Sequence, residues 1–164
     1  MLFYNRKNAT DYALKWWNKT NPNYFNYDNL GGDCTNFISQ CLFAGSKIMN
    51  LTKTFGWYYI NANNKSPSWT GVEYFYKFII NNQGIGPTGK LCNINELEIG
   101  DIIQLNQNIF FNHSVIVTKI NKNTPPNYLH DIFVTAHSNN VKNKNLSLYN
   151  AKDFRFIKIL NINS

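Results

Sequence analysis

The sequence predicts a single α+β domain, in which helices come first and an antiparallel sheet follows. Apolar residues recur at helical spacing in the earlier part of the chain, and short runs rich in β-branched and aromatic residues fill the later part. Helices and strands do not alternate, which favours an antiparallel sheet over a parallel one. The chain has 164 residues, 43% of them hydrophobic, and no repeat or low-complexity linker, so we expect residues 1–164 to form one domain.

The spacing of apolar residues predicts three helices. The first ends at the turn TNPN, and its apolar residues are Ala9, Tyr12, Ala13, Trp16 and Trp17. The second begins near Cys34 and is closed by Gly45, with an apolar stripe of Cys34, Phe37, Ile38, Cys41 and Leu42. The third begins near Thr70, where Glu73 would complete a capping box. Its expected inner face consists of Val72, Phe75, Tyr76 and Ile79.

Four strands are expected after the stretch GIGPTGK. Their sequences are DIIQL (101–105), HSVIVTKI (113–120), IFVTAH (132–137) and FRFIKIL (154–160). The segment NKNTPPN, between the second and third of these, is expected to form a long hairpin loop. The second and third strands therefore pair as a hairpin in this interpretation.

The charge of the chain favours anionic partners. Sixteen Lys and Arg residues against nine Asp and Glu residues give a net charge of +7. The basic residues are scattered and form no stripe, which argues against nucleic-acid binding. No apolar run approaches the roughly 18 residues needed to cross a membrane. The N-terminal sequence MLFYNRKNATDY lacks the apolar stretch of a signal peptide, so an exported protein would need another release route, or the chain is an excised domain.

The three cysteines form no recognisable disulfide framework. Cys34 and Cys41 lie on one helix about 10 Å apart along its axis, too far for a disulfide, and no C-x-x-C pair indicates a zinc site. Cys34 follows Gly31-Gly32 at a helix start, where the helix dipole lowers a thiol pKa. It is therefore either a nucleophile or a buried core residue that begins an apolar stripe. Cys41 and Cys92 are expected to be core residues.

The three histidines differ in their expected roles. His130 lies beside Asp131 at the start of a strand and is expected to be a solvated turn residue. His113 begins one strand of the predicted hairpin and His137 ends the other, so the hairpin would bring them to one end of the sheet. There they could act as a catalytic base and its orienting partner. A two-histidine metal site is the alternative, but no third ligand has suitable spacing.

Four segments together resemble a known group of enzymes. GGDCTNFISQ, LEIGDIIQL, HSVIVTKI and VTAHS look like the papain-like cysteine amidohydrolases and peptidases of the NlpC and CHAP type. The opening WWN and the tail AHSNN…LSLY…FRFIKI are most similar to the putative amidase domains of Gram-positive bacteria and phages. This resemblance implies a papain-like fold, in which the nucleophile begins the central helix and the helices pack on a C-terminal antiparallel sheet.

The resemblance also implies roles for individual residues. The nucleophile falls on Cys34, the base on His113 and the residue that orients the base on His137, with Asn139 as the alternative for that third role. Backbone amides, including that of Cys34, are expected to hold the oxyanion. Asp33 is expected to cap the helix or to bind substrate. No metal or organic cofactor is implied.

Residues 46–68 match no shared element of the resembling families. The aromatic residues in and next to this stretch either wall a substrate groove or pack beneath a long loop; they are Trp57, Tyr58, Tyr59 and Trp69.

The expected function is hydrolysis of an amide bond in peptidoglycan, within the stem peptide or between the lactyl group and L-Ala. The alternatives are an effector that uses the same residues on a protein or lipid, and a catalytically dead module that binds the cell wall. We expect a monomer that works at or outside the cell wall, or after release by lysis, where anionic wall polymers would attract its positive charge.

Overall fold

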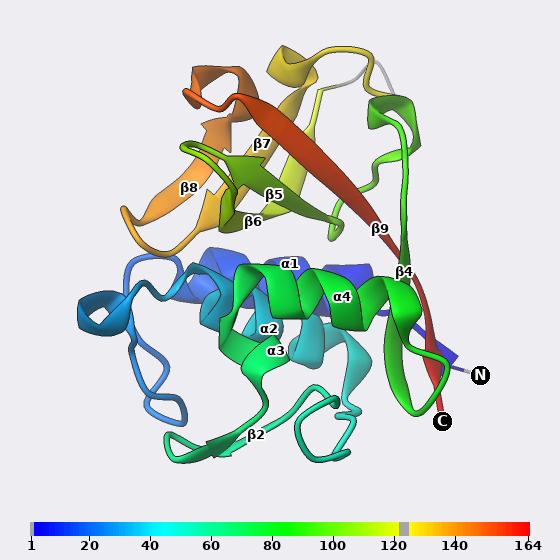
Figure 1. Cartoon of the computed structure of the whole chain (residues 1–164). Helices are drawn as coiled ribbons and strands as arrows, with labels where there is room; N and C mark the ends of the chain where they lie inside the picture. The colour runs from blue at the N-terminus through cyan, green and yellow to red at the C-terminus, as the bar shows by residue number, and fades with distance from the viewer. Residues whose placement is uncertain (1, 122–124) are drawn as a thin grey trace.

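A group of helices lies beneath a twisted antiparallel sheet in the computed structural model (Figure 1). The structure describes residues 2–121 and 125–164. Its α-helices are α1 (Arg6–Trp16), α2 (Cys34–Ser46), α3 (Pro67–Thr70) and α4 (Val72–Asn81). Short 3-10 helices are formed by Asp28–Leu30, Ile94–Glu96, Leu129–Asp131 and Leu146–Leu148.

The main sheet has seven strands, all paired antiparallel, which confirms the expected α+β class. Its strands are β1 (Leu2–Phe3), β4 (Gly86–Leu91), β5 (Ile102–Asn106), β6 (Phe111–Ile120), β7 (Ile132–Ala136), β8 (Val141–Asn145) and β9 (Asp153–Asn163). They follow the order β1-β9-β5-β6-β7-β8, and β4 also pairs with β9. A separate hairpin is made by β2 (Tyr59–Asn61) and β3 (Asn64–Lys65).

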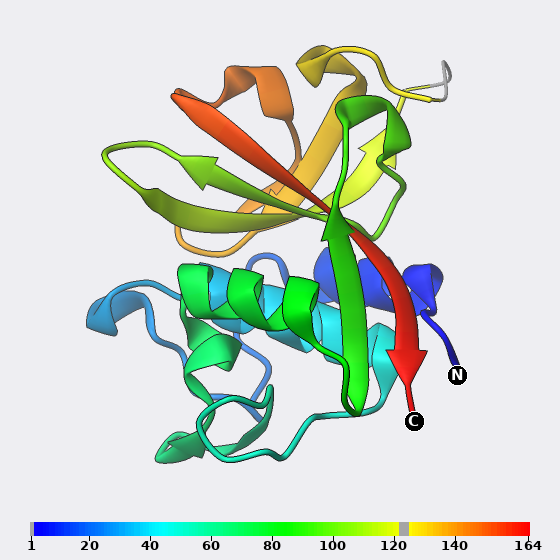
Figure 2. The same ribbon diagram turned by 45° about the vertical axis from the view of Figure 1, so that its right-hand side comes forward.

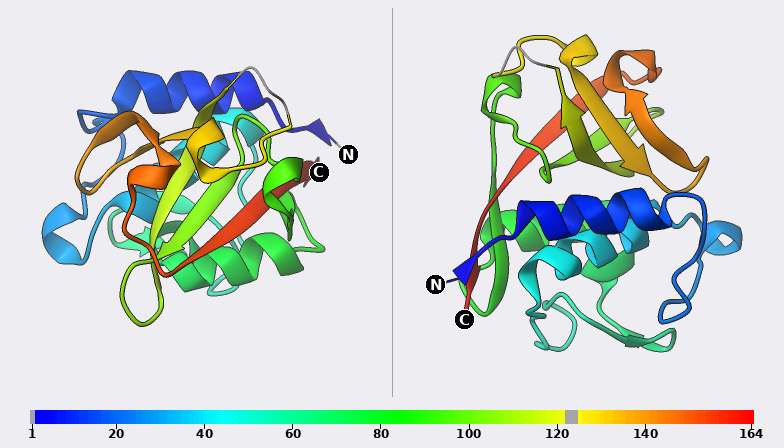
Figure 3. Two further views of the ribbon diagram at one scale, coloured as in Figure 1. Left: turned by 90° about the horizontal axis from the view of Figure 1, so that it is seen from above. Right: turned by 180° about the vertical axis from the view of Figure 1, so that it is seen from behind.

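The helices lie on one side of the sheet, and the strand β9 runs past them to the C-terminus (Figure 2). The view from behind shows α1 lying along the lower side of the sheet (Figure 3). The two termini are close together because Leu2 in β1 pairs with Ile162 in β9. The helix α2 is the central one, since nearly all of its residues are buried between its neighbours and the sheet.

Two hydrophobic cores follow from the alternation of side chains along the strands. One core lies between the helices and the sheet and includes Phe37, Trp69 and Ile116. The other lies on the opposite face of the sheet and includes Val115 and Val117, with residues of β5 and β7. Successive residues of β6 therefore serve different cores, and a shift of one residue changes the face on which a side chain lies.

Gly45 lies inside α2 instead of closing it, so the expected helix stop is wrong. The helix ends at Ser46, and the C-cap residue Lys47 has φ 60° and donates its N–H to the Phe43 carbonyl. A Cβ on Gly45 would collide with the Tyr4 ring and the Asn5 carbonyl. Gly45 is therefore required for close packing of the N-terminal segment against the central helix.

The third expected helix is present, but its start differs from the prediction. Thr70 ends the short α3, and α4 begins after Gly71 with no side-chain cap. Glu73 forms an ion pair with Arg155 at 3.0 Å instead of completing a capping box. The buried face of α4 contains Phe75, Phe78 and Ile79.

The four expected strands are all present, whereas β4 and β8 escaped prediction. The stretch GPTGKL of β4 contains two glycines and a proline, and VKNKN of β8 is largely polar, so neither has the composition typical of a strand. The expected hairpin of β6 and β7 is formed, and residues 122–124 of its loop lie outside the described residues. In the part of the chain that the structure describes, no helix has the length and apolar character needed to cross a membrane.

Candidate active site

The thiol of Cys34 lies at the first residue of α2, with 7% of the residue exposed. Its sulfur accepts a hydrogen bond from the Ser114 amide and lies 3.8 Å from the Thr35 hydroxyl. The Thr35 and Ser114 hydroxyl oxygens are 3.0 Å apart. These contacts join the start of α2 to β6 at the residue that follows His113.

Burial changes the expected protonation of this thiol. It raises the pKa of Cys34, and the hydrogen bonds from the Ser114 amide and the Thr35 hydroxyl offset only part of the effect. The sequence had predicted a lowered pKa from the helix start alone. That prediction is wrong for this structure, because the position of the thiol between α2 and β6 removes it from water.

His113 shares a pocket of about 300 Å³ with Cys34. The histidine is 8% exposed. Burial lowers its pKa to about 4, and the positive charge of Lys144 acts in the same direction. The imidazole is therefore neutral at pH 7 and can accept a proton.

The other walls of this pocket are mostly polar. Its lining residues are Gly31, Gly32, Cys34, Gln107, Asn112, His113, Ser138, Asn139, Val141, Lys144, Leu148, Tyr149 and Asn150. Gly31 and Gly32 have φ angles of 104° and 112°, which favour glycine. Their lack of side chains leaves the backbone at the pocket wall open to close approach by a ligand.

His137 lies near the same end of the sheet but contacts other groups. Its Nδ1 is 2.7 Å from a carboxylate oxygen of Asp33, and its Nε2 is 2.8 Å from the Trp16 carbonyl oxygen. Its ring stacks on Phe37 with 3.9 Å between the ring centroids. Both ring nitrogens are thus engaged, and among the described residues no hydrogen bond joins His137 to His113. The structure does not bring these two histidines together as a base and its orienting partner.

The strand register explains this separation. Ile116 of β6 pairs with Thr135 of β7, and β7 ends at Ala136; continuing the same register by two residues would place His137 opposite Ser114. His113 is one residue away and lies on the other face of the sheet. The same separation removes the geometry that a two-histidine metal site would need. Among the described residues, no group of three or more His, Cys, Asp and Glu could hold a metal ion.

Asp33 is 1% exposed. The sequence predicted that it caps the helix or binds substrate, whereas its contacts in the structure are structural. Its side chain makes no capping hydrogen bond to α2. It accepts hydrogen bonds from the Tyr27 amide at 2.9 Å and from the Asn36 side chain at 2.8 Å, in addition to its contact with His137. Asp33 and His137 therefore tie the start of α2 to the end of α1.

Asn139, the alternative third residue, lines the pocket with His113 and has φ 71°. Among the described residues it makes no hydrogen bond to His113. Tyr149 is a further neighbour of His113, with 6.0 Å between the two ring centroids. Its hydroxyl is buried without a hydrogen-bond partner among the described residues. Burial raises the pKa of Tyr149 to about 12, so this hydroxyl keeps its proton at neutral pH.

Sequence reasoning missed Lys144 and Tyr149 as pocket residues. Tyr149 lies in the segment LSLYN, which the resemblance included without a role for this residue. Lys144 is one of many lysines and lies on β8, a strand that the sequence did not predict. No local signal in the sequence distinguishes it from the others.

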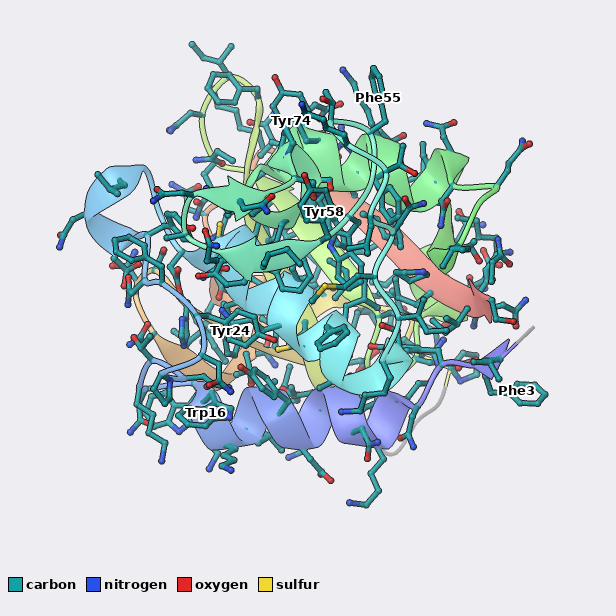
Figure 4. All side chains as sticks on the ribbon, turned by 90° about the horizontal axis from the view of Figure 1, so that it is seen from below. Phe3, Trp16, Tyr24, Phe55, Tyr58 and Tyr74 are labelled. Carbon is teal, nitrogen blue, oxygen red and sulfur yellow. The ribbon has the colours of Figure 1, made fainter. Side chains whose placement is uncertain are left out.

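Trp57 and Trp69 are core residues, so neither can wall a groove. Both are fully buried, and their indole N–H groups donate to the Ser39 hydroxyl and the Asn36 carbonyl oxygen at 3.0 Å each. The exposed aromatic residues of this region are Phe55 and Tyr74 (Figure 4). His130 is a mostly exposed turn residue, as expected, with its side chain 65% exposed.

Comparison with known proteins identifies related sequences. The family model described as "Putative amidase domain" matches residues 3–160. The protein named "Uncharacterized protein YhbB" of Bacillus subtilis (strain 168) is 37% identical over 128 residues, which cover 75% of this chain and 40% of that protein. The chain thus spans about two fifths of the length of this relative. No solved structure matches the chain at a significant level.

Proposed function

The chain belongs to the Putative amidase domain family, and from this membership we propose that it hydrolyses an amide bond with Cys34 as nucleophile and His113 as general base. The observation that supports the proposal best is the shared pocket, in which a cysteine and a neutral histidine face the same space. A cysteine nucleophile needs an adjacent base. The proposed arrangement is of the papain-like type, with the nucleophile at the start of a central helix.

The resting pair is neutral in this mechanism. Because burial raises the pKa of Cys34 and lowers that of His113, the proton stays on sulfur until substrate arrives. The thiol then transfers its proton to His113 as the sulfur attacks the carbonyl carbon. The imidazolium returns this proton to the nitrogen of the leaving amine as the C–N bond breaks. A water molecule, deprotonated by His113, next attacks the thioester and releases the acid and the free thiol.

The first turn of α2 is the proposed oxyanion site. Asp33 provides no side-chain cap for this turn, so its first amides are left without a capping acceptor. Such amides, at the positive end of a helix, stabilise the negative charge that develops on the carbonyl oxygen. The Asp33–His137 contact supports this site indirectly, since it holds the residue before Cys34 in position.

Peptidoglycan is the proposed substrate, with cleavage in the stem peptide or between the lactyl group and L-Ala. The net charge of +7 would favour binding near anionic wall polymers. The protein would then act at or outside the cell wall, or after release by lysis.

Digestion of purified cell walls tests this function. Cys34→Ala should abolish the release of new amines, and His113→Ala should lower kcat roughly 100- to 10,000-fold. Cys92→Ala is the matched control, because Cys92 is half-buried and outside the pocket, and it should clear walls at the normal rate. Mass spectrometry of the fragments would identify the bond. Equal clearing by Cys34→Ala, His113→Ala and the unmodified protein would contradict the cysteine mechanism.

A further inference from the structure

One cationic side chain lies in an otherwise uncharged pocket. Among the lining residues, Lys144 alone carries a charge at neutral pH, since the pKa of His113 is about 4. The remaining walls are glycines, amides, hydroxyls and apolar side chains. Asp28 accepts a hydrogen bond from the Ser138 hydroxyl at 2.8 Å, and neither Asp28 nor Asp33 lines the pocket.

The ammonium group is held at a defined position. Its Nζ lies 4.0 Å from the ring centroid of Tyr149, whose ring is 6.0 Å from that of His113. The lysine is half-buried. No ion pair involves Lys144 in the described ranges, whereas Lys7, Lys90 and Lys158 each pair with a carboxylate. A partly desolvated cation without a carboxylate partner is a favourable site for an anionic ligand.

We propose that this pocket selects substrates that carry a carboxylate close to the scissile amide, and that Lys144 binds this carboxylate. The inference rests on the proposed function and specifies its substrate class. A lysine ammonium binds carboxylates by charge-assisted hydrogen bonds, and the amide side chains of the lining residues Asn139 and Asn150 offer further donors. Peptidoglycan stem peptides satisfy the requirement when their side or terminal carboxyl groups are free, and fail it when these groups are amidated.

Carboxylate binding would also affect the base. The charge of Lys144 contributes to the low pKa of His113, and a carboxylate beside Lys144 would oppose this contribution. His113 would then become a stronger base when a carboxylate substrate is bound. An amidated substrate would lack this effect and would be both bound and cleaved less well.

Three soluble muramyl pentapeptides test the proposal. The first has all carboxyl groups free, the second has the α-carboxyl of its second residue amidated, and the third has its C-terminal carboxyl amidated. Binding is measured by calorimetry on the Cys34→Ala protein, so that hydrolysis is not needed for the result. We expect one of the amidations to weaken binding roughly 10- to 100-fold. Adding Lys144→Met should remove this difference, and Lys144→Arg should retain it.

Lys142→Met is the matched control, because Lys142 is exposed on the same strand β8 and outside the pocket. It should keep the full preference for the free carboxylate. Equal binding of the three peptides, no binding of any, or a preference that survives Lys144→Met would overturn the inference. Hydrolysis by Cys34→Ala would overturn the proposed mechanism instead, so the two failures are distinguishable.

Discussion

Replacing His137 by leucine tests whether this residue stabilises the start of α2 or orients the base. Leucine fits a similar volume but cannot hydrogen bond to Asp33 or Trp16. The Asp33 side chain is 1% exposed, and the contact that it loses is 2.7 Å long. Leaving a buried acceptor without its hydrogen-bond donor costs about 1–3 kcal/mol. For a domain of this size, such a loss lowers Tm by roughly 2–12 °C.

Urea unfolding of the variant and of the unmodified protein measures the loss. His130→Leu is the control, because His130 is mostly exposed, and it should change the free energy of unfolding by less than about 0.5 kcal/mol. A double-mutant cycle with Asp33→Asn should give a coupling energy of about 1–3 kcal/mol. If His137→Leu instead loses less than about 1 kcal/mol while kcat falls sharply, His137 acts on the base and our interpretation of its contacts fails.

Three further predictions concern the pocket and the helix packing. The acid limb of the kcat/KM profile should lie near pH 4, where His113 of the free enzyme becomes protonated. Lys144→Met should move this limb to higher pH but not as far as 6.5, because the burial of His113 remains. An acid limb near pH 6.5 in the unmodified protein would refute this prediction. Tyr149→Phe should leave Tm unchanged or raise it, because it removes a buried hydroxyl without a partner; a clear drop in thermal melting would reveal a hydrogen bond that the structure lacks. Gly45→Ala should lower the free energy of unfolding in urea by at least about 1–3 kcal/mol, because the new Cβ would collide with Tyr4 and Asn5. Gly84→Ala should lower it by less, because the atom nearest to a Cβ at that position is 3.5 Å away.

Local patterns in the sequence were enough to predict the main elements. The helical spacing from Cys34 to Leu42 predicted α2 and placed the cysteine at its start. The β-branched runs predicted β5, β6, β7 and β9. These predictions succeeded because each depends on residues that are neighbours in the chain.

Strands without a hydrophobic pattern could not be predicted in this way. Strand β4 is held by pairing with β9, which is far along the chain, and β8 is held by pairing with β7. Since β8 was missed, Lys144 could not be assigned to the pocket. Tyr149, which follows β8, could not be assigned there either.

The sequence by itself determined that the main helices precede strands β5, β6, β7 and β9, that a helix begins at Cys34, and which strand carries His113. Only the tertiary structure decided which side chains meet. Side chains alternate along a strand, so an offset of one residue between His113 and His137 places them on opposite faces of the sheet. His137 therefore contacts Asp33 and not His113. The packing of α2 against β6 likewise decided that the Cys34 thiol is buried and its pKa raised. Register and burial depend on contacts between segments distant in the chain, and local sequence patterns do not contain them.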